Sequence, residues 1–240
     1  MRIFYLKNGR TQKVESLRAA LKIEDEDKII AFVGAGGKST LIEALAKELC
    51  VNGKKVIITT TTHIQKPKGF FMTDVQIPQI KEYTGAGKIV IAGNDAGEGK
   101  LKALSLAAFR QLEENCDYLL VEADGARGLP IKVPAEHEPV LPVNTDLVVA
   151  IAGIDALGRS ISDCCHRAEL AADFLGKSLK DCVEAKDFAA IFQSKQGSRK
   201  HVVGRFISIV SKVDGDEELD KARWISKQMK KTMVAVGRAI

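Results

Sequence analysis

Apolar residues in this chain gather in short runs that are separated by amphipathic stretches. The run Ile29–Val33 is continuously apolar, as in a strand buried on both faces, whereas Leu41, Leu45 and Leu49 follow at helical spacing. Such runs recur with helical stretches between them, which predicts a parallel sheet covered by helices. The predicted strands are 28–33, 55–60, 88–92, 118–122, 146–152, 205–211 and 233–236. The predicted helices are 14–21, 39–51, 101–114, 165–175, 179–192 and 217–231.

A glycine-rich turn joins the first buried run to the amphipathic stretch after it. Its sequence is Gly34-Ala35-Gly36-Gly37-Lys38-Ser39-Thr40. Glycines let backbone amides approach an anion, and the dipole of the following helix favours the same anion. In such a phosphate-binding loop, or P-loop, Lys38 reaches the β- and γ-phosphates and Ser39 ligates Mg²⁺. Residues 34–40 are therefore predicted to bind Mg²⁺ with ATP or GTP; the alternative is a glycine-rich turn with a surface lysine.

The spacing of this turn differs from the commonest P-loop pattern. That pattern places a further glycine at position 32, where this chain has Phe32. The shortened form resembles the ATP site of Mur ligases. A dinucleotide-binding fingerprint is excluded, because it would require glycine in place of Ser39. The turn and the alternation of strands and helices predict an α/β protein with a three-layer P-loop NTPase-like fold and a mostly parallel sheet.

The length and composition fit a single domain over residues 1–240. A chain of 240 residues with 45% hydrophobic content can bury one large core. The segment 123–145 is the one long stretch with no regular pattern, and it contains four prolines. Loops of this length in compact domains are usually functional or disordered. Ligands of such sheets bind beyond the carboxyl ends of the strands, so we expect the site among residues that follow the strands.

Two carboxylates end the predicted strand 118–122 and its continuation. Glu122 and Asp124 stand in Glu122-Ala123-Asp124-Gly125, where a P-loop protein carries its second metal-directed acid. A carboxylate there holds the Mg²⁺ shell, and Gly125 brings an amide near the γ-phosphate. The pattern leaves open which acid takes this role. A charged pair that simply ends a buried strand is the alternative.

Two further motifs follow strands at the same predicted edge. The tract Thr59-Thr60-Thr61-Thr62 offers hydroxyls to phosphate, metal or water, with Thr61 as the candidate ligand, although threonine also favours strands for structural reasons. The motif Ser211-Lys212-Val213-Asp214 resembles the N-K-x-D motif of GTPases, in which the aspartate binds guanine and the lysine lies along the base. Lys212 and Asp214 are therefore candidate base contacts, and Ser211 departs from that motif.

Cations and a cysteine pair supply the remaining candidates. Arg127 and Lys132 belong to a cluster with His137 and Glu138 in the proline-rich segment, where cations neutralise transition-state charge, bind an anionic second substrate or simply face solvent. The sequence Cys164-Cys165-His166-Arg167 invites a redox or soft-ligand role, but buried cysteines at a helix start are the favoured interpretation. Neither His63 nor His137 has the neighbours that a metal site needs.

Composition narrows the functional classes. The net charge of +5, from 36 basic and 31 acidic residues, is mild, and no basic cluster is interleaved with aromatics, so no nucleic-acid partner is expected. No apolar run approaches the roughly 18 residues of a membrane span, and no signal-peptide core is visible, so a cytoplasmic protein without a membrane partner is expected. Five cysteines without C-x-x-C spacing predict neither disulfides nor a zinc ribbon.

Taken together, these motifs resemble the YqeC-type family. The resemblance rests on the short glycine loop, the Thr tract, the stretch 121–128, the stretch from Pro130 to Pro139, and 153–158, and it is most specific in Glu122–Gly128. Proteins of this family are described as accessory factors of selenium-dependent molybdenum hydroxylases. The resemblance implies a P-loop nucleotide site used in maturing a molybdenum enzyme. It further implies the molybdenum cofactor or a molybdenum hydroxylase client as partner.

The leading hypothesis is a Mg²⁺-dependent NTPase that assists such maturation, with Lys38, Glu122, Asp124 and Arg127 in catalytic roles. Glu122 or Asp124 would hold Mg²⁺ with Ser39. One alternative is a transferase or ligase that activates a small acid or cofactor with ATP, which the Mur-like spacing permits. Another is a chaperone that binds the molybdenum cofactor without hydrolysis.

Overall fold

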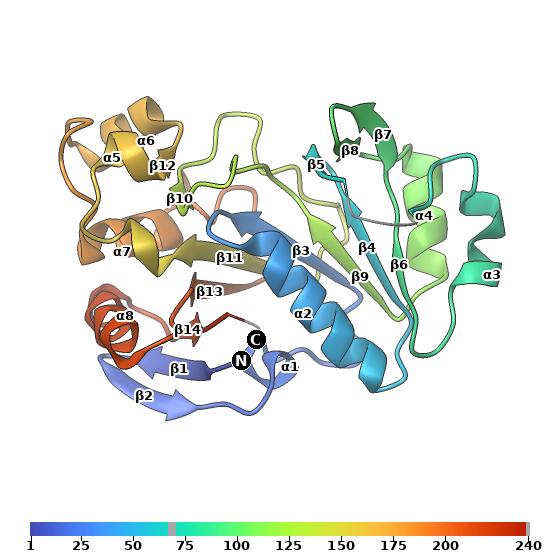
Figure 1. Cartoon of the computed structure of the whole chain (residues 1–240), viewed down its shortest axis with the longest axis horizontal. Helices are drawn as coiled ribbons and strands as arrows, with labels where there is room; N and C mark the ends of the chain where they lie inside the picture. The colour runs from blue at the N-terminus through green and yellow to red at the C-terminus, as the bar shows by residue number, and fades with distance from the viewer. Residues whose placement is uncertain (67–70, 239–240) are drawn as a thin grey trace.

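A nine-stranded sheet runs through the computed structural model, which describes residues 1–66 and 71–238 (Figure 1). The strand order is β2-β1-β14-β13-β11-β3-β9-β4-β6. Every pair from β14 to β6 is parallel, and the hairpin of β1 and β2 adds an antiparallel edge. The strands are β1 Ile3–Lys7, β2 Arg10–Lys13, β3 Ile29–Gly34, β4 Val56–Thr60, β6 Ile89–Ile91, β9 Tyr118–Glu122, β11 Leu147–Gly153, β13 Arg205–Ser211 and β14 Met233–Val236.

Helices cover both faces of this sheet. Along β3, Ile30 and Phe32 pack on the face of α2, whereas Ala31 and Val33 pack on the opposite face. A strand buried on both sides needs apolar residues at every position, which explains the unbroken run. The structure is therefore a three-layer α/β fold with a mostly parallel sheet, as predicted. One face carries α1 Leu17–Ala20 and α2 Lys38–Val51, and the other carries α3 Ile80–Tyr83, α4 Leu106–Glu114, α7 Ala185–Gln193 and α8 Asp216–Gln228.

The predicted elements are found with shifts at their ends. Each of the seven predicted strands lies within one residue of an observed strand. The predicted helix 101–114 begins only at Leu106, because Lys100–Lys102 form β8, which pairs with β5 (Ile64–Gln65) and β7 (Asn94–Gly97). The predicted helix 165–175 begins at Ala168 as α6 (Ala168–Leu175), after β12 (Cys165–His166). The edge hairpin of β1 and β2 was not predicted.

The proline-rich segment 123–145 packs against the glycine-rich turn. Its strand β10 (Ile131–Lys132) pairs in parallel with β12, which follows the short helix α5 (Ile161–Cys164). The Gly36 amide donates to the Leu129 carbonyl at 3.1 Å, and the Gly153 amide donates to the Pro130 carbonyl at 2.7 Å. Segments far apart in sequence thus meet at the carboxyl edge of the sheet. No helix within residues 1–66 and 71–238 has the length and apolarity needed to cross a bilayer.

Candidate functional site

The turn between β3 and α2 has the backbone shape that only glycine adopts readily. Gly34, Gly36 and Gly37 have φ angles of +92°, +79° and +110°. A Cβ at Gly36 would lie 2.2 Å from the Gly153 amide nitrogen, and one at Gly34 would lie 2.3 Å from the Ile151 carbonyl oxygen. Two of these glycines are thus required by close packing against the end of β11 as well as by conformation.

The amides of this turn divide into two groups. The amides of Gly34, Ala35 and Gly36 donate to Asp124 Oδ2, to the Ile151 carbonyl and to the Leu129 carbonyl, at 2.9, 2.8 and 3.1 Å. The next residues start α2, whose first turn has amides without intrahelical acceptors, and no side chain caps them. The first three residues therefore fix the turn, and the amides of the first turn of α2 are those open to an anion.

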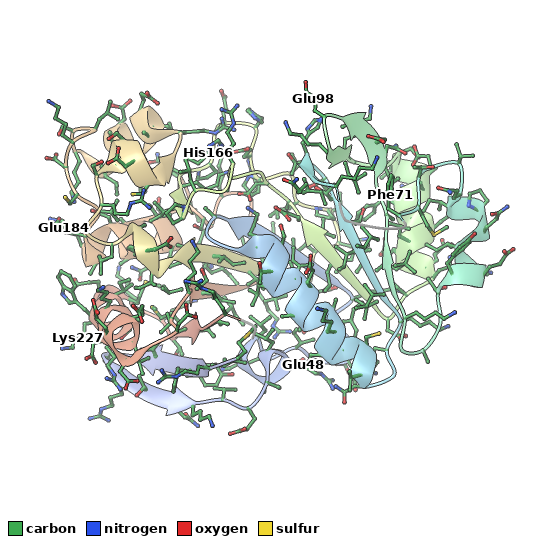
Figure 2. All side chains as sticks on the ribbon, in the orientation of Figure 1. Glu48, Phe71, Glu98, His166, Glu184 and Lys227 are labelled. Carbon is green, nitrogen blue, oxygen red and sulfur yellow. The ribbon has the colours of Figure 1, made fainter. Side chains whose placement is uncertain are left out.

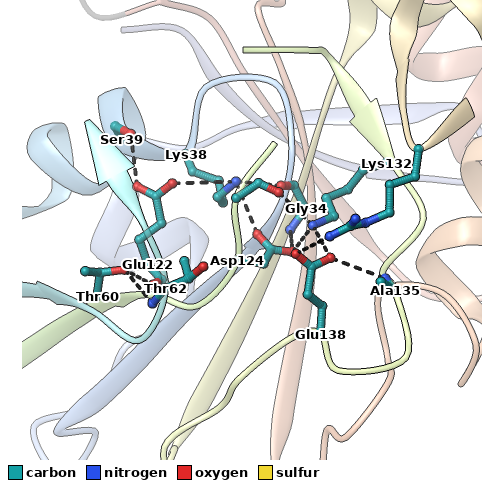
Figure 3. Close-up of polar contacts among 12 residues, drawn as sticks. Gly34, Lys38, Ser39, Thr60, Thr62, Glu122, Asp124, Lys132, Ala135 and Glu138 are labelled. Carbon is teal, nitrogen blue, oxygen red and sulfur yellow. Dashed lines mark hydrogen bonds and ion pairs between the residues drawn. The ribbon is translucent and has the colours of Figure 1, made fainter. Parts of the chain in front are cut away.

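Lys38 is buried beside the turn. Only 4% of the residue is exposed, and its Nζ donates to the Gly34 carbonyl at 2.6 Å (Figure 3). The same Nζ lies 3.2 Å from Asp124 Oδ1 and 3.7 Å from Glu122 Oε1. A buried ammonium needs such compensation, and here it comes from the two acids that end β9. The alternative of a surface lysine on a glycine-rich turn is therefore wrong.

Glu122 contacts the second residue of α2. Ser39 Oγ donates to Glu122 Oε2 at 3.0 Å (Figure 3). Burial raises the pKa of Glu122, against the opposing effect of Lys38 and the Ser39 hydroxyl. A hydroxyl and a carboxylate side by side are the hard oxygen donors that Mg²⁺ prefers, so Ser39 and Glu122 fit a metal ion at the edge of the turn. Asp124 lies deeper, between two lysines, and is less suited to that role.

A chain of alternating charges continues from Asp124 into the proline-rich segment. Lys132 Nζ lies 3.3 Å from Asp124 Oδ2 and 2.8 Å from Glu138 Oε2, and it donates to the Gly125 carbonyl at 2.7 Å. Arg167 Nη2 donates to Glu138 Oε1 at 2.9 Å. Burial opposes ionisation of Glu138, but hydrogen bonds from Lys132 and Arg167 prevail and lower its pKa to about 2. Lys132 thus faces inward and compensates two carboxylates.

Two cavities meet at the turn. The first, of about 670 Å³, lies between the turn and the ends of β13 and β14, and the second, of about 640 Å³, lies between the turn and the segment 123–145. Gly36, Gly37 and Thr40 line both of them. Ser39 and Glu122 line only the second. An elongated ligand that crosses the turn would therefore have one end in each cavity.

The first cavity holds the predicted base contacts. Lys212 and Asp214 both line it, but each already has a protein partner. Lys212 Nζ lies 2.6 Å from Asp155 Oδ2, and the Asp214 carboxylate accepts from the Arg238 backbone amide at 2.7 Å and from Arg238 Nε at 2.9 Å. Ser211 donates its hydroxyl to the Gly36 carbonyl, which ties the end of β13 to the turn.

The hydroxyls of the threonine tract make hydrogen bonds to the protein backbone. Thr59, Thr60 and Thr61 donate their hydroxyls to the carbonyls of Ala92, Glu122 and Val140, at 2.9, 2.8 and 2.7 Å. Thr62, and not Thr61, lines the second cavity. The tract therefore joins β4 to its neighbours, and the predicted ligand role of Thr61 has no contact here to support it.

The second cavity also contains residues whose place the sequence did not reveal. Pairing of β12 with β10 brings His166 and Arg167 to its wall, next to Arg127 and His137 of the proline-rich segment. In Figure 2, His166 lies toward the top of the view, above the carboxyl ends of the central strands. The sequence pattern favoured a structural role for this stretch on account of its cysteines. Cys164 and Cys165 are indeed buried, and burial raises their pKa to about 11 and about 12.

The fold and this turn define a P-loop-like α/β protein. Within that class the chain belongs to the YqeC family, because the family described as "YqeC protein" matches residues 30–169. This confirms the resemblance seen in the motifs. "Uncharacterized protein YqeC" of Escherichia coli (strain K12) is 36% identical over 140 residues, which are 56% of this chain and 55% of that protein. The chain thus spans about half the length of that curated relative.

One solved structure is also similar in part. It is a crystal structure of PAB0955, a GTPase from Pyrococcus abyssi, in the apo form. The two chains share 14% sequence identity with a TM-score of 0.36, over 85% of this chain and 78% of that one.

Proposed function

We propose that this protein binds a Mg²⁺–nucleoside triphosphate across the turn 34–40 and hydrolyses it. The observation that carries the proposal is the buried Lys38 at the first turn of α2, held by Glu122 and Asp124 beside a serine hydroxyl. A lysine in this position would neutralise β- and γ-phosphates, and Ser39 and Glu122 would hold a magnesium ion that offsets further phosphate charge. The nucleoside would occupy the first cavity and the phosphates the second.

The residues of the site have separate tasks in this proposal. The amides at the start of α2 bind phosphate oxygens, with the helix dipole favouring negative charge. To reach a phosphate, Lys38 must break at least one of its ion pairs with Glu122 and Asp124. The negative charge of the phosphate then replaces the lost carboxylate contact. Magnesium, when bound, polarises the terminal phosphate. Arg127, on the far wall of the second cavity, neutralises charge that develops in the transition state.

Calorimetry with ATP and GTP in the presence of Mg²⁺ tests this proposal. The Lys38→Ala variant should lose nucleotide affinity by at least 100-fold, because charge-assisted contacts to phosphate are worth roughly 1.5–3 kcal/mol each. Lys47→Ala is the matched control, since Lys47 is an exposed lysine on the same helix. Equal affinity of the Lys38→Ala variant and the wild-type protein would refute the assignment.

In this proposal, the residues that line the first cavity determine whether ATP or GTP is bound. Asp214 is proposed to bind the base, and guanine binding would require its carboxylate to exchange the contacts with Arg238. Asp214→Asn should then weaken GTP binding and leave ATP binding almost unchanged. An equal effect on both nucleotides would assign the nucleoside contacts to other residues of the cavity.

We extend the proposal to a role in maturing a selenium-dependent molybdenum hydroxylase in the cytoplasm, on the basis of family membership. In cells that lack this protein, hydroxylase activity should fall and should return with the wild-type chain but not with Lys38→Ala. Return of activity with both would separate the nucleotide site from the accessory role. A transferase is the second candidate, because the second cavity extends beyond the turn; strict dependence of nucleotide turnover on an acceptor would favour it.

A further inference from the structure

The second cavity is richer in positive charge than a nucleotide's phosphates alone require. Besides Lys38 it is lined by Lys100, Arg127 and Arg167, together with three histidines, His63, His137 and His166. Its two acids, Glu122 and Glu138, already pair with Lys38, Lys132 and Arg167. The cavity therefore keeps a surplus of positive charge after its internal ion pairs are counted.

Arg127 contributes part of this surplus. Within residues 1–66 and 71–238 its guanidinium has no ion pair or hydrogen bond. Its backbone has φ of +48°, a left-handed conformation that costs an L-residue energy and that clusters at functional sites. Arg127 is exposed and lines the cavity, so its guanidinium is accessible to a ligand there.

Arg167, which also lines the second cavity, has a left-handed backbone too. Its φ is +63°, and it follows β12 directly. One terminal nitrogen binds Glu138, but its Nε is buried and has no hydrogen-bond partner among the residues that the structure describes. A buried donor without an acceptor is costly, and an oxyanion in the cavity would supply the acceptor.

His166 is influenced by the charges of both arginines. Burial, followed by the charges of Lys132 and Arg167, lowers its pKa, so the ring is neutral near pH 7. It adds a hydrogen-bonding edge without further charge. The positive charge of this wall therefore comes from guanidinium groups, which bind planar or tetrahedral oxyanions through paired N–H donors.

We infer that the second cavity binds a second ligand, a small molecule that carries a phosphate or carboxylate group, held by Arg127 and Arg167 opposite the terminal phosphate of the nucleotide. This inference rests on the proposed nucleotide site for the position of that phosphate. A volume of about 640 Å³ is within the range of small-molecule sites and exceeds what a phosphate tail needs. All residues that line the cavity fall within the stretch 30–169 that matches the family.

Binding of inorganic phosphate to nucleotide-saturated protein tests the inference. The P-loop is first filled with Mg²⁺ and a non-hydrolysable triphosphate analogue, and radiolabelled phosphate is then added in equilibrium dialysis. Wild-type protein should bind one phosphate, and Arg127→Gln and Arg167→Gln should each weaken that binding about tenfold or more. Arg223→Gln, at a half-buried arginine of α8 that lines neither cavity, should bind phosphate as the wild type does.

Citrate as a competitor distinguishes the two ligand chemistries. If citrate displaces phosphate at lower concentration than phosphate itself binds, the site prefers carboxylates; if it does not, the site prefers phosphates. Thermal unfolding midpoints of both arginine variants close to that of the wild-type protein show that they are folded. Absence of phosphate binding to the loaded wild-type protein, or equal binding by the Arg127 and Arg167 variants, would overturn the inference.

Failure of the proposed function gives a different result. In that case the triphosphate analogue does not bind the wild-type protein at all. Phosphate titration of the Lys38→Ala variant, in which the turn has lost its lysine, then tests the second cavity alone. Loss of phosphate binding in the double variant Lys38→Ala/Arg127→Gln would support the inference of a second ligand site. Phosphate binding by this double variant equal to that of Lys38→Ala would overturn it.

Discussion

Three of the seven non-glycine residues with positive φ in the described part of the chain line a cavity at the turn. These three residues are Arg127, Arg167 and Lys212. The left-handed region costs an L-residue roughly 1–2 kcal/mol, so these positions store strain. Sequence patterns do not predict these positive φ angles, because arginine and lysine have no preference for the left-handed conformation.

Arg127 allows this strain to be measured. Its side chain has no polar partner in the described part of the chain, so truncation removes little packing. Arg127→Gly should therefore be more stable than Arg127→Ala by about 1 kcal/mol, because glycine adopts positive φ without a steric penalty. Urea unfolding of the two variants measures the difference. Equal stability would show that the local backbone relaxes in the alanine variant.

Glu138 gives the site a pH-dependent contribution to stability. Its pKa is lowered to about 2 by Lys132 and Arg167, so its stabilising effect is fully present above its ordinary pKa of 4.5 and is lost as the pH falls toward 2. At pH 7, Glu138→Gln should be less stable by on the order of 3 kcal/mol, since the buried Lys132 loses one of its two carboxylate partners and Arg167 loses its own.

The measurement for Glu138 is the free energy of unfolding of both proteins between pH 7 and pH 2. The difference between wild type and variant should shrink only below about pH 4.5, because other carboxylates titrate equally in both proteins. A difference that stays constant over this range would show that Glu138 is not ionised through the ion pairs with Lys132 and Arg167.

At the scale of elements, the sequence predicted what depends on local pattern and missed what depends on pairing. Strand β3 and helix α2 were found because an unbroken apolar run and a 3.6-residue repeat are strong local signals. The hairpin of β1 and β2 was missed because β2 is a short, polar and largely exposed edge strand without apolar alternation. The strand β12 was read as helix because two residues paired with a distant loop leave no pattern of their own.

The same distinction applies to the site. Lys38, Ser39 and Glu122 were predicted because they stand at fixed positions around a strand end and a glycine turn. Arg167 was passed over because only the pairing of β10 with β12 brings it to the cavity. Lys132 was expected to face a ligand, but it is buried between Asp124 and Glu138, and the sequence pattern does not show that these two acids turn toward it.

The close contact between the glycine-rich turn and the proline-rich segment requires glycine at position 36. Gly36→Ala would place its Cβ 2.2 Å from the Gly153 nitrogen and 2.7 Å from the Pro130 oxygen, both backbone atoms that cannot step aside. We expect a loss of stability of about 3 kcal/mol or more, from steric strain added to the unfavourable φ. The matched control is Gly53→Ala, which has φ of +76° but open space around it and should lose only about 1–2 kcal/mol. Thermal unfolding of both variants measures the difference, and similar losses would show that the turn shifts to make room.

At the scale of the whole molecule, the site lies where separate parts of the chain converge. Four parts of the chain line the second cavity: the start of α2, the end of β9, the segment 123–145 and the β12–α6 junction. The ion pairs from Lys38 through Asp124, Lys132 and Glu138 to Arg167 connect them. A ligand that attracts Lys38 changes the charge balance along this whole series, so binding at the turn reaches the proline-rich segment.

Hydrogen exchange with and without a Mg²⁺–triphosphate tests this connection. Nucleotide at 100 times its dissociation constant stabilises the folded state by about 2.7 kcal/mol, and protection should rise at residues 34–40, in the segment 123–145 and around Arg167. The edge hairpin of β1 and β2 contributes nothing to the second cavity and should gain protection only through global stabilisation. With Lys38→Ala the same nucleotide concentration should stabilise the protein by about 0.4 kcal/mol or less, whereas Lys47→Ala should respond as the wild type does. Protection confined to residues 34–40 would mean that the turn binds nucleotide without engaging the loop, and the ion pairs through Lys132 would then be structural alone.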